Sequence, residues 1–104
     1  MKDKVLATVI AAVHDMRLPG HLYGTGALMV CAAKAIEHER NGDPWTPASV
    51  MQEYAEEKGY IQHTVWVNIQ HALEHGRGPA SPAKAIKAIV KGAYHNGCLE
   101  DCVI

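Results

Sequence analysis

The chain has 104 residues, 48% of them hydrophobic and 20% charged, which is typical of one folded domain with a modest core and excludes an intrinsically disordered chain. The formal net charge of −1 excludes a uniformly basic protein, so a nucleic-acid-binding surface would need Lys and Arg gathered on one side. No apolar run approaches the roughly 20 residues that a membrane-spanning helix needs. We therefore expect a single domain over residues 1–104 that has no contact with a membrane.

The first two predicted helices follow from apolar spacing. Apolar side chains recur at the helical positions i, i+4, i+7 and i+11 from Val5, which predicts a helix over residues 3–17. The sequence Leu-Pro-Gly at 18–20 ends it, because a proline disfavours helical geometry in the residue before it. A second helix is predicted over residues 24–39, before a loop at 41–44 with the sequence Asn-Gly-Asp-Pro.

Cap residues mark the third and fourth helices. Thr46 and Pro47 start the third helix, since a threonine hydroxyl caps free N–H groups and a proline is tolerated at the first helical position. This helix is predicted to run to Lys58, with Gly59 as the residue that ends it. The fourth helix is predicted over residues 62–75. Residues from about 50 to 75 therefore have the pattern of a helix-turn-helix.

A last helix closes the predicted fold. Ser81 and Pro82 repeat the cap-and-proline signal and open a helix that runs to about residue 93, whereas residues 95–104 give no clear pattern. The chain has no phenylalanine, and no segment alternates with the period of two expected of a strand. The sequence thus predicts an all-α fold, a compact domain of about five or six helices that contains a helix-turn-helix.

The three cysteines bear on the cellular compartment. Cys31, Cys98 and Cys102 form no dense disulfide framework, so we expect reduced thiols and a cytoplasmic protein. The start of the chain is partly similar to a secretory leader, but Asp3 interrupts its basic segment and the helical pattern continues past the apolar run. We therefore expect no signal peptide.

Three segments carry a resemblance to a known family. They are LPGHLYG at 18–24, YAEEK at 54–58, and the ordered positions Val65, Ile69, His71 and Ala72. Together they resemble the DNA-binding effector domain of the sporulation master response regulators, over about residues 9–90. The resemblance implies an all-helical DNA-binding transcription regulator. These residues include no phosphoacceptor receiver domain, so control by phosphorylation is not implied.

The resemblance also implies which residues face DNA. It makes residues 62–75 the recognition helix, with the contact positions His63, Thr64, Trp66, Val67 and Gln70. The family carries arginines at the positions of Thr64, Val67 and Gln70 and an acidic residue at that of Trp66. Here no Lys or Arg occurs between Gly59 and Gly76, so the ionic contacts of the family have no counterpart on this helix.

The residues present favour a different kind of DNA site. A helical wheel places Val65, Ile69, Ala72 and Leu73 on the buried face of the recognition helix. On the opposite face, Gln70 can pair with adenine and Val67 can pack on a thymine methyl group. We therefore expect sites that contain A·T pairs, bound weakly for lack of arginine contacts to guanine and phosphate.

Basic residues elsewhere are candidates for phosphate contacts. Lys84, Lys87 and Lys91 recur at i, i+3 and i+7 and form one stripe on the last helix. A solvated helix face explains the stripe equally, since surface lysines are common. At the position of Tyr23 the family has a basic residue that approaches the DNA backbone.

Two functional hypotheses remain open at this point. In the first, the chain binds double-stranded DNA, as one copy or as a homodimer on two half-sites. In the second, it is a protein-interaction module that kept the helical fold and lost DNA readout. The surface of Thr64, Trp66, Val67 and Gln70 would then contact a protein partner, and an exposed Trp66 would favour this hypothesis.

The motifs for metal and cofactor chemistry are incomplete. His71, Glu74 and His75 match the H-x-x-E-H order of inverted zinc peptidases, but no third ligand is evident and the chain has no room for a substrate cleft. Cys98 and Cys102 do not have the spacing of a zinc knuckle. We therefore expect no enzyme activity, no bound metal and no cofactor.

Overall fold

The computed structural model describes residues 3–20, 22–77, 79 and 81–95, and all regular secondary structure within them is helical. The predicted all-α class is therefore confirmed. Cys98 and Cys102 lie outside the described residues, as does most of the segment 95–104 that gave no clear pattern. In chain order, the helices are α1 (Asp3–Asp15), α2 (Tyr23–Asn41), α3 (Pro47–Lys58), α4 (Gln62–Glu74) and α5 (Pro82–His95).

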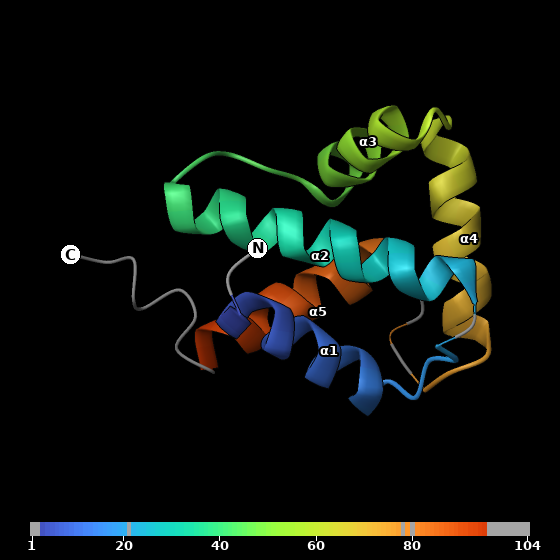
Figure 1. Ribbon diagram of the computed structural model, residues 1–104, viewed down its shortest axis with the longest axis horizontal. Helices are drawn as coiled ribbons and strands as arrows, with labels where there is room; N and C mark the ends of the chain where they lie inside the picture. The colour runs from blue at the N-terminus through green and yellow to red at the C-terminus, as the bar shows by residue number, and fades with distance from the viewer. Residues whose placement is uncertain (1–2, 21, 78, 80, 96–104) are drawn as a thin grey trace.

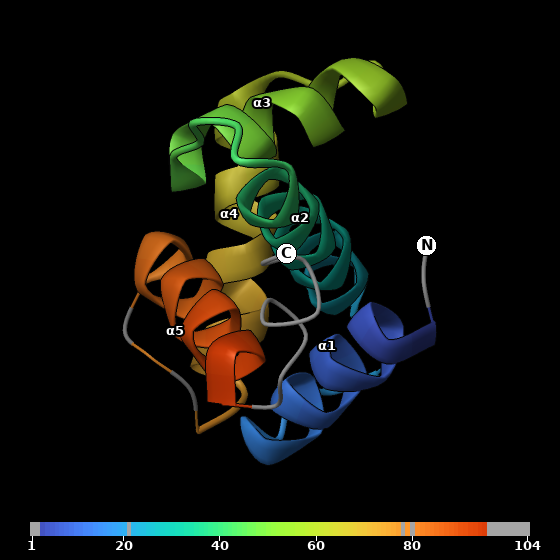
Figure 2. The same cartoon turned by 90° about the vertical axis from the view of Figure 1, so that its left-hand side faces the viewer.

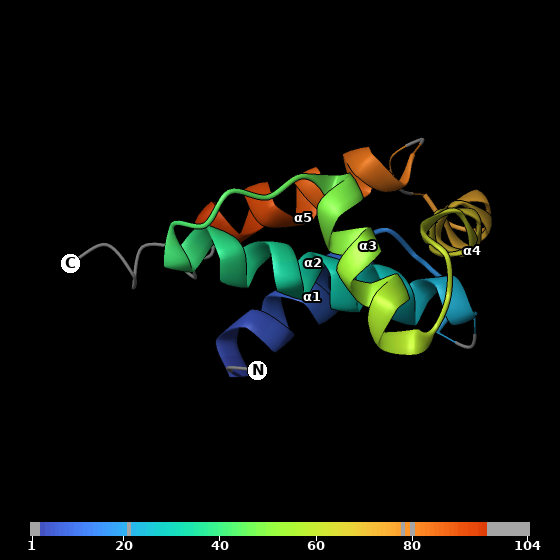
Figure 3. The same ribbon diagram turned by 90° about the horizontal axis from the view of Figure 1, so that it is seen from above.

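The other four helices surround α2. In Figures 1 and 2, α3 lies on one side of α2, α1 and α5 lie on the other, and α4 stands across the end at which α2 begins. Figure 3 shows α3 crossing over α2, with α5 along its flank. This arrangement follows from the composition of α2, whose buried positions include four alanines and one glycine, so that neighbouring helices can approach it closely.

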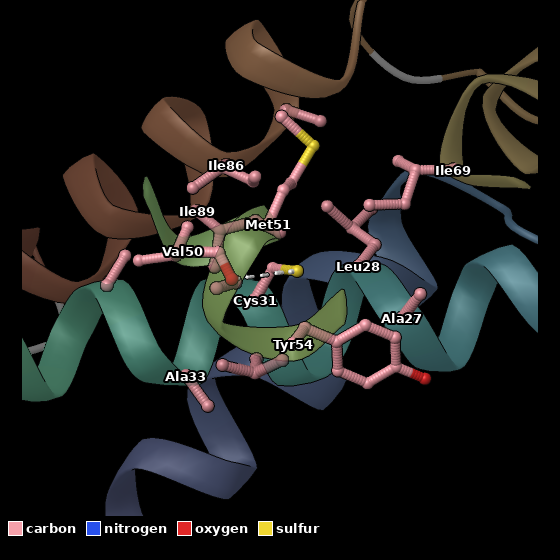
Figure 4. Close-up of a cluster of buried hydrophobic side chains, with 14 of the residues drawn as sticks. Ala27, Leu28, Cys31, Ala33, Val50, Met51, Tyr54, Ile69, Ile86 and Ile89 are labelled. Atoms are coloured by element: carbon pink, nitrogen blue, oxygen red, sulfur yellow. Dashed lines mark hydrogen bonds between the residues drawn. The ribbon is translucent and has the colours of Figure 1, made fainter. Parts of the chain in front are cut away.

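One hydrophobic core contains side chains from all five helices. Figure 4 shows its centre, where Leu28 and Cys31 of α2 meet Val50 of α3, Ile69 of α4 and Ile86 of α5. The Cys31 thiol donates to the Val50 carbonyl at 3.8 Å. Burial raises the pKa of this thiol to about 12, so Cys31 is an unreactive core residue.

Helices α1, α2 and α3 end in the same hydrogen-bond pattern, the Schellman motif. In each, a residue with positive φ follows the helix, and the next N–H bonds back to a carbonyl five residues earlier. Gly42 (φ 74°) and Gly59 (φ 73°) fill this position after α2 and α3, and Gly59 was predicted to do so. Arg17 (φ 56°) fills it after α1, which therefore ends at Asp15 rather than at residue 17 as predicted.

The remaining boundaries differ from the predicted ones by at most two residues. Helix α2 is longer than predicted, because it continues through Asn41 to its cap at Gly42. Helix α4 ends one residue early, with His75 as its C-cap. Helix α5 begins at Pro82 as predicted, after Ser81, whose hydroxyl accepts a hydrogen bond from the Lys84 N–H at 3.3 Å.

Candidate nucleic-acid interface

The cap at the start of α3 and the turn at its end determine where α4 begins. Thr46 caps α3, with its hydroxyl accepting from the Ser49 N–H at 3.0 Å, and the Ser49 hydroxyl accepts from the Thr46 N–H at 2.9 Å. This reciprocal pair is a capping box, in which serine takes the place of the usual Glu or Gln. At the other end, Gly59 turns the chain, and α4 begins three residues later at Gln62. The two helices predicted over residues 50–75 are therefore present as α3 and α4.

The buried face of α4 is the face that the helical wheel predicted. Val65, Ile69, Ala72 and Leu73 are all buried, as predicted. Helix α2 approaches α4 closely at Gly24, where an added Cβ would lie 1.8 Å from the Asn68 carbonyl oxygen. Only a residue without a side chain lets the first turn of α2 meet the α4 backbone at this distance. Gly24 therefore sets the position of α4 in the fold.

The outer face of α4 is exposed and largely uncharged. Val67 is 44% exposed and Trp66 38% exposed, and His63 is exposed beside them. The His63 and Trp66 rings are nearly parallel, with 6° between their planes and 6.3 Å between their centroids. Thr64 is half-buried on the same helix. Three of the five contact positions implied by the resemblance are thus exposed, and Thr64 is partly exposed.

Gln70, the fifth contact position, is less exposed than predicted. Its side chain is only partly exposed, and its Oε1 is buried with no hydrogen-bond partner among the described residues. The helical wheel placed Gln70 on the outer face, but in the structure this residue is only partly in contact with solvent. An amide oriented in this way does not present its oxygen to a base edge.

A chain of tyrosine hydroxyls lies beside the start of α4. The Tyr54 hydroxyl of α3 is hydrogen-bonded to the Tyr23 hydroxyl at 3.4 Å, and the Tyr23 hydroxyl is hydrogen-bonded to the Tyr60 hydroxyl at 2.9 Å. The Tyr23 and Tyr60 rings meet edge to face, with centroids 5.8 Å apart. Of these three tyrosines, only Tyr23 was expected near DNA from the sequence. A single sequence gives no signal that Tyr23 pairs with Tyr54 and Tyr60, which lie 31 and 37 residues further along the chain.

The three lysines of α5 are all exposed, as a stripe on one helix face should be. Their surroundings differ. Lys87 lines a surface hollow beside the start of α3. The carboxylates of Glu39 and Asp43 line the same hollow and repel an anionic ligand there. Lys84 lies in the first turn of α5, and the last turns of α5, which carry Lys91, lie at the opposite end of the molecule from α4 (Figure 1).

Lys34 and His38 of α2 contact carboxylates of α3. Lys34 forms an ion pair with Glu57, and the His38 Nε2 lies 2.9 Å from a Glu53 oxygen. The other ring nitrogen of His38 lies 3.8 Å from Asp43. These contacts join α2, α3 and the loop between them, and Lys34, His38 and Glu53 line a hollow on this surface. They are exposed or half-exposed, so we assign them a modest share of stability.

The H-x-x-E-H segment lies at the end of α4. The His71 and His75 rings meet edge to face with centroids 4.7 Å apart, and both residues are exposed. Among the described residues, no group of three His, Cys, Asp or Glu side chains is placed to hold a metal ion. The ring contact and the exposed position fit two surface residues one helical turn apart.

Comparison of the chain with protein-family models, with curated proteins and with solved structures finds no match. None of the described helices is long and apolar enough to cross a membrane.

Proposed function

We propose that this protein binds double-stranded DNA with α4 in the major groove and acts as a transcription regulator of the sporulation-regulator effector type. The observation that carries the proposal is the presentation of α4. One face of this helix is buried on α2, and the other exposes His63, Trp66 and Val67. A major groove accommodates one α-helix, and a helix held from behind after a short turn is the usual reader of it.

The outer face of α4 determines what kind of DNA it fits. Val67 can pack on a thymine methyl group, and Thr64 can bond to a base or a phosphate. No Lys or Arg occurs from residue 60 to residue 75, so contacts to guanine by arginine are absent from this helix. Sites with A·T pairs fit this face best. Gln70 would take part only if its amide turned out of the position it has here.

The resemblance to the sporulation regulators supports the same assignment. One resembling segment, residues 18–24, contains Gly24, which packs on the α4 backbone. The resembling positions on α4 include Val65, Ile69 and Ala72, which are all buried. The resembling residues are therefore largely those that hold α4 in place. The residues that would read DNA differ, so we expect a different operator.

The test is a selection of bound sequences from a random DNA pool at low salt. We expect enrichment of a site with A·T pairs, and a loss of about 1 kcal/mol at one base position in the Val67→Ala variant, since a methyl contact is removed. Ile10→Ala, which truncates a side chain that is 48% exposed on α1, is the matched control and should bind like the unchanged protein.

A specific observation favours a second function, a protein-interaction module. Ile61 is 68% exposed at the start of α4, Trp66 and Val67 are exposed on the same helix, and α4 itself carries no Lys or Arg to attract phosphates. If no sequence is enriched at any salt concentration while circular dichroism reports a helical protein, DNA binding is excluded. The neutral face of α4 is then better explained as a contact surface for another protein.

A further inference from the structure

The tyrosine chain at the start of α4 runs from the core to the surface. Tyr54 is buried, its hydroxyl lies 3.4 Å from that of Tyr23, and the Tyr23 hydroxyl lies 2.9 Å from that of Tyr60, whose side chain is 40% exposed. Each hydroxyl carries one proton and can also accept a hydrogen bond, so the bonds along the chain can run in either direction. When Tyr54 donates to Tyr23 and Tyr23 donates to Tyr60, the Tyr60 proton is left for a ligand. The chain therefore ends in a hydroxyl that can donate to a ligand at the surface.

Lys58 lies near this end of the chain. Its charge lowers the pKa of Tyr60, and its Nζ lies 6.0 Å from the centroid of the Tyr54 ring. The neighbouring carboxylates are engaged elsewhere, since Glu57 pairs with Lys34 and Glu56 accepts a hydrogen bond from Gln52. Lys58 has no carboxylate partner among the described residues, so its charge is free to attract an anion.

The protonation of Tyr60 favours donation at neutral pH. The hydrogen bond with Tyr23 is the main cause that raises the pKa of Tyr60 above its ordinary value, because the bond stabilises the protonated phenol when the Tyr60 O–H donates, and the charge of Lys58 lowers this pKa only in part. Tyr60 therefore keeps its proton under all physiological conditions. A phosphate at the surface reverses the direction of the chain by accepting the Tyr60 proton in place of Tyr23. A hydroxyl that already accepts one hydrogen bond is also a stronger donor in a polarised chain.

We propose that Tyr60 and Lys58 form a phosphate-binding site whose ligand is a phosphodiester of the DNA backbone. A phosphate oxygen accepts from a tyrosine hydroxyl and from a lysine ammonium, and such contacts fix the register of a protein on the duplex. Tyr60 precedes α4 by two residues, so the phosphate it holds flanks the groove that α4 enters. Tyr23 and Tyr54 are positioning residues that orient the Tyr60 hydroxyl.

This inference rests on the proposed function, and the experiment separates the two. Affinities for the selected duplex and for an unrelated duplex are measured as a function of salt concentration, for the unchanged protein, Tyr60→Phe and Lys58→Gln. Tyr60→Phe should weaken binding about tenfold on both duplexes and leave the salt dependence unchanged, because it removes a hydrogen bond and no charge. Lys58→Gln should weaken both and reduce the slope of log affinity against log salt by about 0.9.

The matched control is Lys4→Gln, which removes the same charge in the first turn of α1, away from α4, and should leave the slope unchanged. Circular dichroism checks that each variant is folded. If the unchanged protein binds DNA and both Tyr60→Phe and Lys58→Gln bind equally well, the phosphate site is refuted and the proposed function stands. If the unchanged protein binds neither duplex, both proposals are refuted.

Discussion

Arg17 occupies a backbone position that glycine occupies twice elsewhere in this protein. The residues at the ends of α1, α2 and α3 have nearly the same positive φ, but only Gly42 and Gly59 reach it without steric cost. For a residue with a Cβ atom, the left-handed region costs about 1–2 kcal/mol. Arg17 also explains the one helix end that was predicted two residues late, because the sequence pattern for a helix stop relies on Gly and Pro.

Replacing Arg17 with glycine should stabilise the protein. Relief of the left-handed geometry outweighs the greater freedom that glycine gives the unfolded chain, which costs about 0.4–1 kcal/mol. We expect the free energy of unfolding in urea to rise by about 0.5–1 kcal/mol. Gly59→Ala is the reverse control and should lower it. A decrease for Arg17→Gly would contradict this account of the α1 end.

At the scale of helices, the contact between α2 and α4 decides where the candidate interface lies. Gly24 allows this contact, and Gly26 in the same helix has open space around its Cα. Gly24→Ala should therefore cost about 1–3 kcal/mol of unfolding free energy, because the Asn68 backbone must move away. Gly26→Ala should stabilise α2 by up to about 1 kcal/mol, because alanine is the better helix former.

Thermal and urea denaturation of both variants checks this prediction. The same variants should also separate in DNA affinity, because only Gly24→Ala displaces α4 relative to α2. Equal stabilities for Gly24→Ala and Gly26→Ala would mean that α4 does not approach α2 as closely as the structure has it.

Helix positions were the most predictable feature at this scale. Thr46–Pro47 and Ser81–Pro82 signal the starts of α3 and α5 through local chemistry that needs no tertiary information. The buried face of α4 follows from its own periodicity. The partial burial of Gln70 could not be predicted in this way. A helical wheel divides a helix into a buried face and an exposed face, whereas the exposure of a residue between the two faces depends on the neighbouring helices.

For the whole molecule, the core joins all five helices around Cys31, so local opening should not expose this thiol. In a variant with Cys98→Ser and Cys102→Ser, a thiol reagent at neutral pH should label Cys31 at least about a thousandfold more slowly than in the urea-unfolded chain. Burial holds the pKa of this thiol at about 12, so the native protein has almost no reactive thiolate.

The control for this measurement is circular dichroism along the same urea series. The labelling rate and the helical signal should change over the same range of urea concentration, as expected of one cooperative unit. Rapid labelling of a fully helical protein would contradict the assignment of Cys31 to a rigid core.

The sequence by itself determined the all-α class, the starts of α3 and α5, and the apolar face of α4, because caps and periodicity act over a few residues. Only the tertiary structure decided which polar side chains meet. Tyr23, Tyr54 and Tyr60 come from α2, α3 and the turn after α3, and their hydroxyls line up because α2 and α3 pack against each other. Burial of the Gln70 oxygen likewise depends on atoms distant in sequence, which no local pattern records.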